Sequence, residues 1–161
     1  MQQPFMQPIE QEAIHLIGLS LKHQTTNANG QSATDCGNLW QEFEKGNYAA
    51  LIPDKLNQDV LAVYHNYEGD HTHPYSYFIG CKVKPGTAAP AGLNSLVIPK
   101  GAYQRITAKG KIPDCVADAW RQIWKSSRPR AYRPDFEVYD HRSRDWENAE
   151  VEIFLSINIA S

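Results

Sequence analysis

The order of predicted elements along the chain constrains its fold more than any other sequence feature. A strand, a helix and two further strands follow one another within residues 9–84, and the same order returns within residues 101–159. Two helices among six or more strands cannot build a doubly wound parallel sheet. The sequence therefore predicts an α+β fold of two pseudo-symmetric strand–helix–strand–strand modules. They would form one antiparallel sheet with both helices on one face, which leaves the other face free to be a groove.

Two segments have the 3.6-residue periodicity of amphipathic helices. The first spans about residues 32–47 and can be capped by Ser32 or Thr34, since a hydroxyl accepts from the free amides of a first turn. The second spans residues 113–126 and opens with Pro113, a residue suited to the first helical turn. Their apolar stripes hold Leu39, Trp40 and Phe43 in the first helix, and Val116, Ala119, Trp120, Ile123 and Trp124 in the second.

Seven segments have the apolar, β-branched and aromatic content that is typical of strands. Loops rich in Gly, Pro, Asn and Asp separate them. The predicted strands span residues 9–22, 59–66, 75–84, 93–98, 102–109, 135–140 and 150–158.

Composition and charge argue against several classes of protein. A net charge of −2 disfavours sequence-independent binding to nucleic acid, which needs a basic surface, and the basic run 125–133 fits a solvated helix end and loop. No apolar run approaches the roughly 20 residues of a membrane helix, so no membrane association is expected. Cys36, Cys81 and Cys115 are odd in number and form no CxxC pair, which favours reduced thiols in a cytoplasmic protein.

The sequence contains no recognisable catalytic motif. It lacks a GxSxG nucleophile elbow and a phosphate-binding glycine loop, so no catalytic residue and no cofactor is predicted. Asp70, His71 and His73 share one turn, but an open zinc site needs three converging ligands. A hydrophilic turn before Pro74 is the simpler interpretation, and no metal site is predicted.

Three stretches carry a resemblance to a known family. They are AVYHNYEGDHTHPYSYFIGCKV (62–83), VIPKGAYQRITAKG (97–110) and PDFEVYDHRSRDWENAEVEIFLSI (134–157), and the connecting AWRQIWKSS (119–127) also fits. In order and spacing they resemble the gyrase-inhibitor-like (GyrI-like) effector-binding domain of AraC-type and multidrug-sensing bacterial transcription activators. The likeness is strongest to the stand-alone, integron-associated effector-binding proteins, and it covers about residues 9–159.

The resemblance implies a function as well as a fold. Residues 1–161 would be one effector-binding domain with pseudo-repeats at about 9–84 and 101–159, and its ligand cleft would lie near their junction. Members of the family bind small hydrophobic cations against a glutamate in the strand after the second helix, which corresponds to Glu137. The chain has no room for a helix-turn-helix domain, so a link to transcription regulation would not involve direct contact with DNA.

The alternation of residues along 135–140 leaves two environments open for Glu137. Phe136 and Val138 point to one face, and Asp135, Glu137 and Tyr139 point to the other. If the helices cover Phe136 and Val138, Glu137 lies on the free face. The residues alone favour a solvent-facing carboxylate, as for most glutamates in strands. The resemblance instead favours a carboxylate inside an aromatic groove.

Aromatic side chains are the other candidate ligand contacts. The resemblance points to Tyr75 or Tyr77 and to Trp120 and Trp124, and Tyr77 is preferred because Tyr75 directly follows Pro74. Trp120 continues an apolar stripe with Val116 and Ile123, which favours core packing for it, whereas Trp124 can equally be core or a ligand contact. The remaining candidates are Trp40 and Phe43, in the corresponding place on the first helix, and Tyr139, with Tyr64 and Tyr103 ranked lower.

Three functions remain open from the sequence. The first is non-catalytic binding of hydrophobic cations, by a carboxylate and by ring faces that attract positive charge. The second is hydrolysis of a small molecule by Glu137 acting with a tyrosine as base and acid. The third is a protein-interaction module whose separate partner would be a regulator or a topoisomerase.

Overall fold

The computed structural model describes residues 8–126 and 128–158, and within them eight strands form one antiparallel sheet. The strand order is β1-β6-β8-β7-β3-β4-β2-β5. All predicted strand segments are present, and the first is divided into two. The strands are β1 (Ile9–Gln11), β2 (Ile14–Ser20), β3 (Val60–His65), β4 (Ser76–Lys82), β5 (Asn94–Ile98), β6 (Gly101–Gly110), β7 (Asp135–Tyr139) and β8 (Ala149–Ser156).

Helices connect the strands at equivalent places in the two halves of the sheet. The helices are α1 (Gln31–Lys45), the short α2 (Tyr48–Leu51) and α3 (Asp114–Lys125). Strands β2-β4-β3 and β6-β8-β7 follow the same path, and the two halves meet where β3 pairs with β7. This arrangement confirms the α+β, antiparallel prediction, while the assignment of residues 1–161 to one effector-binding domain stays a prediction. None of the helices in the described part is long and apolar enough to span a membrane.

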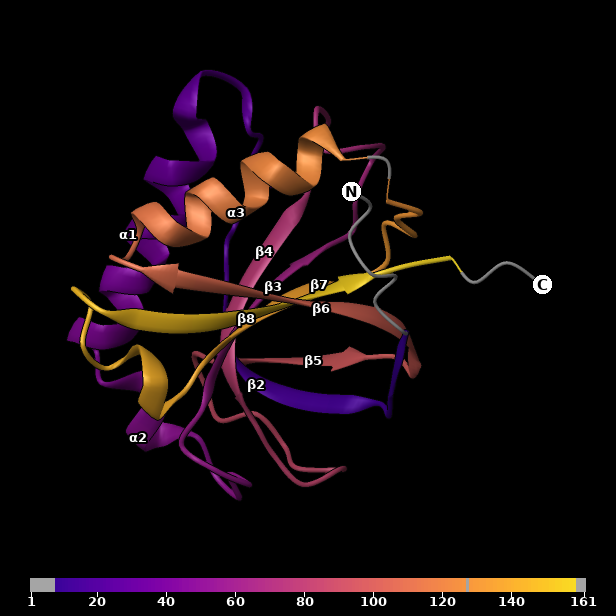
Figure 1. The fold of residues 1–161 in the computed structure, drawn as a ribbon. Coiled ribbons are helices and arrows are strands. Elements are labelled where there is room, and N and C mark those ends of the chain that lie inside the picture. Colours follow the sequence, from indigo (N-terminus) through magenta and orange to yellow (C-terminus); the bar gives the residue numbers. More distant parts are fainter. Residues whose placement is uncertain (1–7, 127, 159–161) are drawn as a thin grey trace.

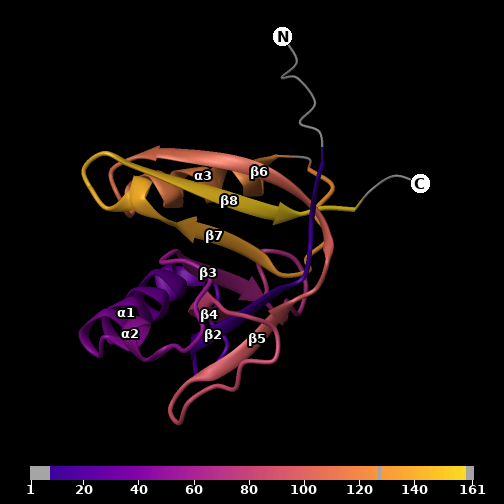
Figure 2. The same ribbon diagram turned by 90° about the horizontal axis from the view of Figure 1, so that it is seen from below.

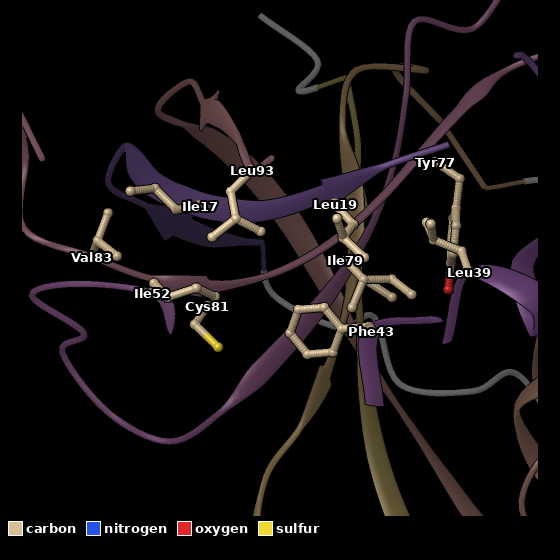
Figure 3. Close-up of a cluster of buried hydrophobic side chains, with 11 residues drawn as sticks. Ile17, Leu19, Leu39, Phe43, Ile52, Tyr77, Ile79, Cys81, Val83 and Leu93 are labelled. Carbon is tan, nitrogen blue, oxygen red and sulfur yellow. The ribbon is translucent and has the colours of Figure 1, made fainter. Parts of the chain in front are cut away.

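Both main helices pack on the same face of the sheet (Figure 1). Leu39 and Phe43 of α1 pack with strand residues such as Ile79, as Figure 3 shows. On the other half, Trp120 and Ile123 of α3 pack against residues of β6 and β8. The apolar stripes predicted from helical periodicity therefore form the sides of both helices that face the sheet. The two helices lie on either side of the β3–β7 junction.

The opposite face of the sheet is filled by its own side chains. The sheet curls (Figure 2), so strands of the two halves approach one another on the helix-free side. Phe136 and Val138 are buried there among residues from six strands. The sequence prediction of an open groove on this face was wrong, because a strongly curled sheet buries its concave side without helices. The other members of the cluster are Ile14, Leu16, Leu61, Val63, Phe78, Ile98, Tyr103 and Phe154.

The beginning of α1 differs from the predicted cap. A 3₁₀ turn, η1 (Ala28–Gly30), leads directly into the helix, and Gly30 occupies the N-cap with a φ of 70°. That left-handed conformation favours glycine. No side chain caps this helix among the described residues, and the amide of Ser32 donates to the carbonyl of Thr26 at 2.9 Å instead. Neither Ser32 nor Thr34 is the cap, because the chain has already become helical at Gln31.

Candidate ligand-binding site

A cavity of about 1010 Å³ opens between α1 and α3, above the junction of β3 and β7. Helices and strands of both halves contribute to its wall, in which aromatic and apolar side chains are joined by polar ones and by the charged groups of Glu44, Asp59, Arg121, Arg130, Glu137, Asp140 and Arg144. Its volume suits a drug-sized molecule. The inner wall includes Cys36, Trp40, Tyr64, Tyr67, Tyr75, Tyr77, Val116, Trp120, Trp124, Arg130, Glu137 and Tyr139.

Glu137 lies at the bottom of this cavity and is only 1% exposed. Three neutral groups donate hydrogen bonds of 2.6 Å to its carboxylate. The hydroxyl of Tyr64 and Nε1 of Trp120 donate to Oε2, and the hydroxyl of Tyr139 donates to Oε1. None of the ion pairs formed within residues 8–126 and 128–158 includes Glu137. The carboxylate is therefore hydrogen-bonded without a basic partner.

The protonation of these groups follows from their burial. Burial raises the pKa of Glu137 above its ordinary value, and the hydrogen bonds from Tyr139, Tyr64 and Trp120 oppose that shift. Burial, followed by the nearby charge of Glu137, raises the pKa of the Tyr64 and Tyr139 hydroxyls well above their usual range. Both tyrosines therefore remain neutral donors, while Glu137 keeps its proton to a higher pH than an exposed glutamate does.

Aromatic rings form a continuous wall around the carboxylate. Tyr64 lies 5.0 Å from the rings of both Tyr77 and Trp120, measured between centroids, and Trp40 meets Tyr139 edge-on at 4.8 Å. Nε1 of Trp40 also donates to the Tyr77 hydroxyl at 2.8 Å. These contacts link α1 to β4 and β7, so the ring positions are fixed by both helices before a ligand arrives.

Two further rings extend the wall away from Glu137. The Tyr75 hydroxyl donates to Oδ1 of Asn27 at 2.8 Å. Trp124, at the end of α3, stacks on His71 with ring centroids 5.3 Å apart. His73 instead contacts Oδ1 of Asp70 at 3.0 Å, and no cluster of three metal-binding side chains occurs in the described residues.

A buried ion pair borders the same cavity. Nη2 of Arg130 donates to Oδ2 of Asp135 at 2.9 Å, and the two side chains are 6% and 0% exposed. Burial raises the pKa of Asp135, and the Arg130 charge opposes the shift. The charges of Arg130 and Asp135 offset each other. The net charge of these three buried groups is therefore that of Glu137, which is negative when Glu137 is ionised.

The structure brings together most of the residues singled out in the sequence. Glu137, Tyr75, Tyr77, Tyr139, Trp40, Trp120 and Trp124 all line the cavity. Phe43 does not: it lies three residues beyond Trp40, on the side of α1 that packs against the sheet and near the ring of Tyr48. Tyr103 lies on the opposite face. Glu137 is on the helix-bearing face, not the free face.

Sequence reasoning gave too little weight to Tyr64 and missed Arg130 and Tyr67. Tyr64 lies on the cavity side of β3, as does Ala62, which is the cross-strand partner of Glu137. The proximity of Tyr64 to Glu137 follows from the pairing register of β3 and β7, which the sequence does not give. Arg130 belongs to a run that was interpreted as solvated, although its side chain is buried. Its proximity in sequence to Asp135 was the one available signal.

Comparison with known proteins identifies the family. The model of the family described as Cass2, integron-associated effector binding protein, matches residues 9–157. The chain belongs to the Cass2 family. An integron cassette protein from Vibrio cholerae is 26% identical to this Cass2 family member, with a TM-score of 0.71 over 95% of each chain.

Two further relatives extend the comparison of the Cass2 family member. The Bacillus subtilis (strain 168) protein named "Putative transcriptional regulator protein YobU" is 27% identical over 123 residues, which are 74% of this chain and 77% of that protein. The structure of SAV2435 bound to tetraphenylphosphonium has the same fold, with a TM-score of 0.76 at 17% identity over 96% and 94% of the two chains.

Proposed function

We propose that this Cass2 family member binds small, hydrophobic organic cations without transforming them, with Glu137 as their counter-ion. The observation that carries the proposal is a carboxylate that is 1% exposed, held by three neutral donors and paired with no basic group among the described residues. An ionised carboxylate removed from water is costly unless an opposite charge accompanies it. A cationic ligand supplies that charge.

Magnitudes favour a cation over a neutral ligand of the same size. Two unit charges 4 Å apart attract by about 4 kcal/mol at an effective dielectric constant of 20. Each ring face in contact with the cation adds about 0.5–2 kcal/mol. The same rings already attract a cation of the protein itself, because the guanidinium of Arg130 lies 5.7 Å from the ring centre of Trp120.

The shape of the cavity supports broad selectivity. Its volume of about 1010 Å³ exceeds what a single small metabolite fills, and flat aromatic walls accept many ligand outlines. The ligand of SAV2435, tetraphenylphosphonium, is a bulky aromatic cation of this kind. The three cysteines are free thiols, which supports a reducing compartment such as the cytoplasm as the place of binding.

Titration with methyltriphenylphosphonium and with triphenylphosphine oxide tests the proposal. The two compounds share three phenyl rings and differ in charge, and quenching of tryptophan fluorescence reports binding because four tryptophans line the cavity. We expect saturable binding of the cation at least tenfold tighter than that of the oxide. Equal affinities, or absence of saturation by the cation, would contradict the proposal.

The contact of Glu137 with two tyrosine hydroxyls favours a second candidate, hydrolysis of an electrophilic small molecule. A carboxylate and a neutral tyrosine 2.6 Å apart can act as general base and acid. Incubation followed by mass spectrometry separates the two functions. Binding predicts a ligand of unchanged mass, whereas hydrolysis predicts a product heavier by one water or split into two fragments.

A further inference from the structure

The guanidinium of Arg130 has donors that its protein partner does not use. Nη2 bonds to Asp135, while Nε and Nη1 are buried and find no acceptor within residues 8–126 and 128–158. The side chain is 6% exposed, and Arg130 borders the cavity that holds Glu137. Buried donors without an acceptor are rare in folded proteins and call for a specific explanation.

Asp135 cannot supply the missing acceptor. Its Oδ1 accepts from the amide and the hydroxyl of Ser156, at 2.7 and 2.8 Å, and its Oδ2 accepts from Arg130 and the Tyr67 hydroxyl. Both oxygens are therefore occupied. Nη2 is committed to Asp135, and the hydrogens of Nε and Nη1, which point to different sides of the guanidinium, remain unused among the described residues.

Trp120 connects Arg130 with Glu137. Its indole nitrogen donates to Oε2 of Glu137, and its ring lies 5.7 Å from the guanidinium carbon of Arg130. The two charged groups are thus in contact with one side chain, on the wall of one cavity. Tyr132 covers the guanidinium at 4.3 Å and does not border the cavity, whereas Tyr67, at 5.9 Å, does.

We propose that Arg130 forms a second subsite of this cavity, which holds a carboxylate or carbonyl oxygen of the ligand. Nη1 carries two N–H donors, and a charged donor forms a strong hydrogen bond with a single carboxylate or carbonyl oxygen. The preferred ligand is then amphoteric: a hydrophobic cation that carries an oxygen acceptor about one indole width from its positive centre. Because Nη1 is shielded from solvent, an acceptor reaches it when the ring of Tyr67 turns aside. This inference rests on the proposed cation binding and specifies its ligand class.

Two dyes with one cationic skeleton test the subsite. Rhodamine 19 carries a free carboxylate, and rhodamine 6G is its ethyl ester. The measured quantity is the ratio of their dissociation constants, ester over acid, which cancels the contribution of the shared skeleton. The variant combines Arg130→Gln with Asp135→Asn, so that the buried pair is replaced by a neutral pair and no charge is left alone, and circular dichroism confirms its folding.

We expect the ratio to fall at least tenfold from the wild type to the double variant. Arg128→Gln is the matched control, because Arg128 lies two residues away, also has a buried Nε without a partner in the described residues, and does not border the cavity. Its ratio should stay within twofold of the wild type. A ratio unchanged in the double variant, or lowered equally by Arg128→Gln, would overturn the subsite.

If the double variant does not fold, the wild type still decides the question. A crystal structure with rhodamine 19 should place a carboxylate oxygen within hydrogen-bond distance of Nη1 of Arg130, and a carboxylate directed elsewhere would refute the inference. Failure of the proposed function is recognised separately, since tetraphenylphosphonium, which has no oxygen, would then not bind the wild type at all.

Discussion

Ala62 of β3 and Glu137 of β7 are cross-strand partners at the line where the two halves of the sheet meet. Tyr64 follows Ala62 by two residues, and Tyr139 follows Glu137 by two residues. The hydroxyl of Tyr64 donates to Oε2 of Glu137, and that of Tyr139 donates to Oε1. The halves thus supply equivalent tyrosines, and they differ at one central position, where one has alanine and the other glutamate. The site depends on both halves, and the buried carboxylate at its centre comes from one of them.

The affinity for cations should depend on pH through Glu137. Burial raises the pKa of Glu137, so protonation removes the counter-charge at a pH where an exposed glutamate would still be ionised. Binding of methyltriphenylphosphonium should weaken as pH falls through that raised pKa, with a limiting slope of about tenfold per pH unit for one proton. Calorimetric titrations at several pH values measure this slope. A pH-independent affinity would exclude Glu137 as the ionised group.

Glu137→Gln should stabilise the ligand-free protein at high pH. Because the folded-state pKa is raised, the wild type loses stability as pH rises from the ordinary glutamate range through the raised value. The amide has no charge to lose, and it can still accept from Tyr64 and Trp120 and donate to Tyr139. The variant should melt above the wild type at pH 8, by about 2–4 °C for each kcal/mol gained. The difference should disappear as the pH falls well below the ordinary glutamate pKa of about 4.3, where the carboxyl is protonated in both the folded and the unfolded state.

Trp120→Phe and Trp40→Phe form a matched pair that tests the hydrogen bond to Glu137. Both remove an indole donor from the cavity wall, but Trp120 donates to the carboxylate and Trp40 to the Tyr77 hydroxyl. A hydrogen bond to a charged group contributes about 1.5–3 kcal/mol. Trp120→Phe should therefore raise the pKa of Glu137 further, and should raise the pH below which cation binding is lost by about one unit or more. Trp40→Phe should leave that pH midpoint unchanged, so equal shifts would contradict the account.

Phe43→Ala should affect stability and not ligand selectivity. Phe43 is 3% exposed and packs between α1 and the sheet, so its removal should cost about 3–5 kcal/mol of unfolding free energy. Denaturant unfolding measures the loss. The ratio of affinities for methyltriphenylphosphonium and triphenylphosphine oxide should stay the same, since Phe43 does not line the cavity. A changed ratio of affinities would indicate that Phe43 contributes to the ligand-binding site.

Most of the fold was predictable because its signals are local. Alternation in segments such as 135–140 and helical spacing in 113–126 identify strands and helices directly. The curl of the sheet is not local, since it brings Leu16 of β2 into one buried cluster with residues of β7 and β8. Without the curl, the helix-free face looked open, and the groove was assigned to the wrong side.

The type of site, a carboxylate among aromatic rings, was predictable from the sequence. Which residues line it was less predictable. Alternation correctly separated Glu137 from Phe136, but it could not tell which of the two faces the helices cover. Trp40 and Phe43 share a helical stripe, and a spacing of three does not show which one reaches the edge of the helix. Arg130 escaped notice because a basic run is usually solvated, and its burial depends on the fold around Asp135.

The central claim is that the charge of Glu137 selects cations, and one comparison tests it most directly. The ratio of dissociation constants for triphenylphosphine oxide and methyltriphenylphosphonium is measured by calorimetry at pH 8 for the wild type and for Glu137→Gln. The account predicts a ratio that favours the cation at least tenfold in the wild type and falls close to one in the variant, with little change in the affinity for the oxide. A preference for the cation that survives in Glu137→Gln would show that selectivity has another source.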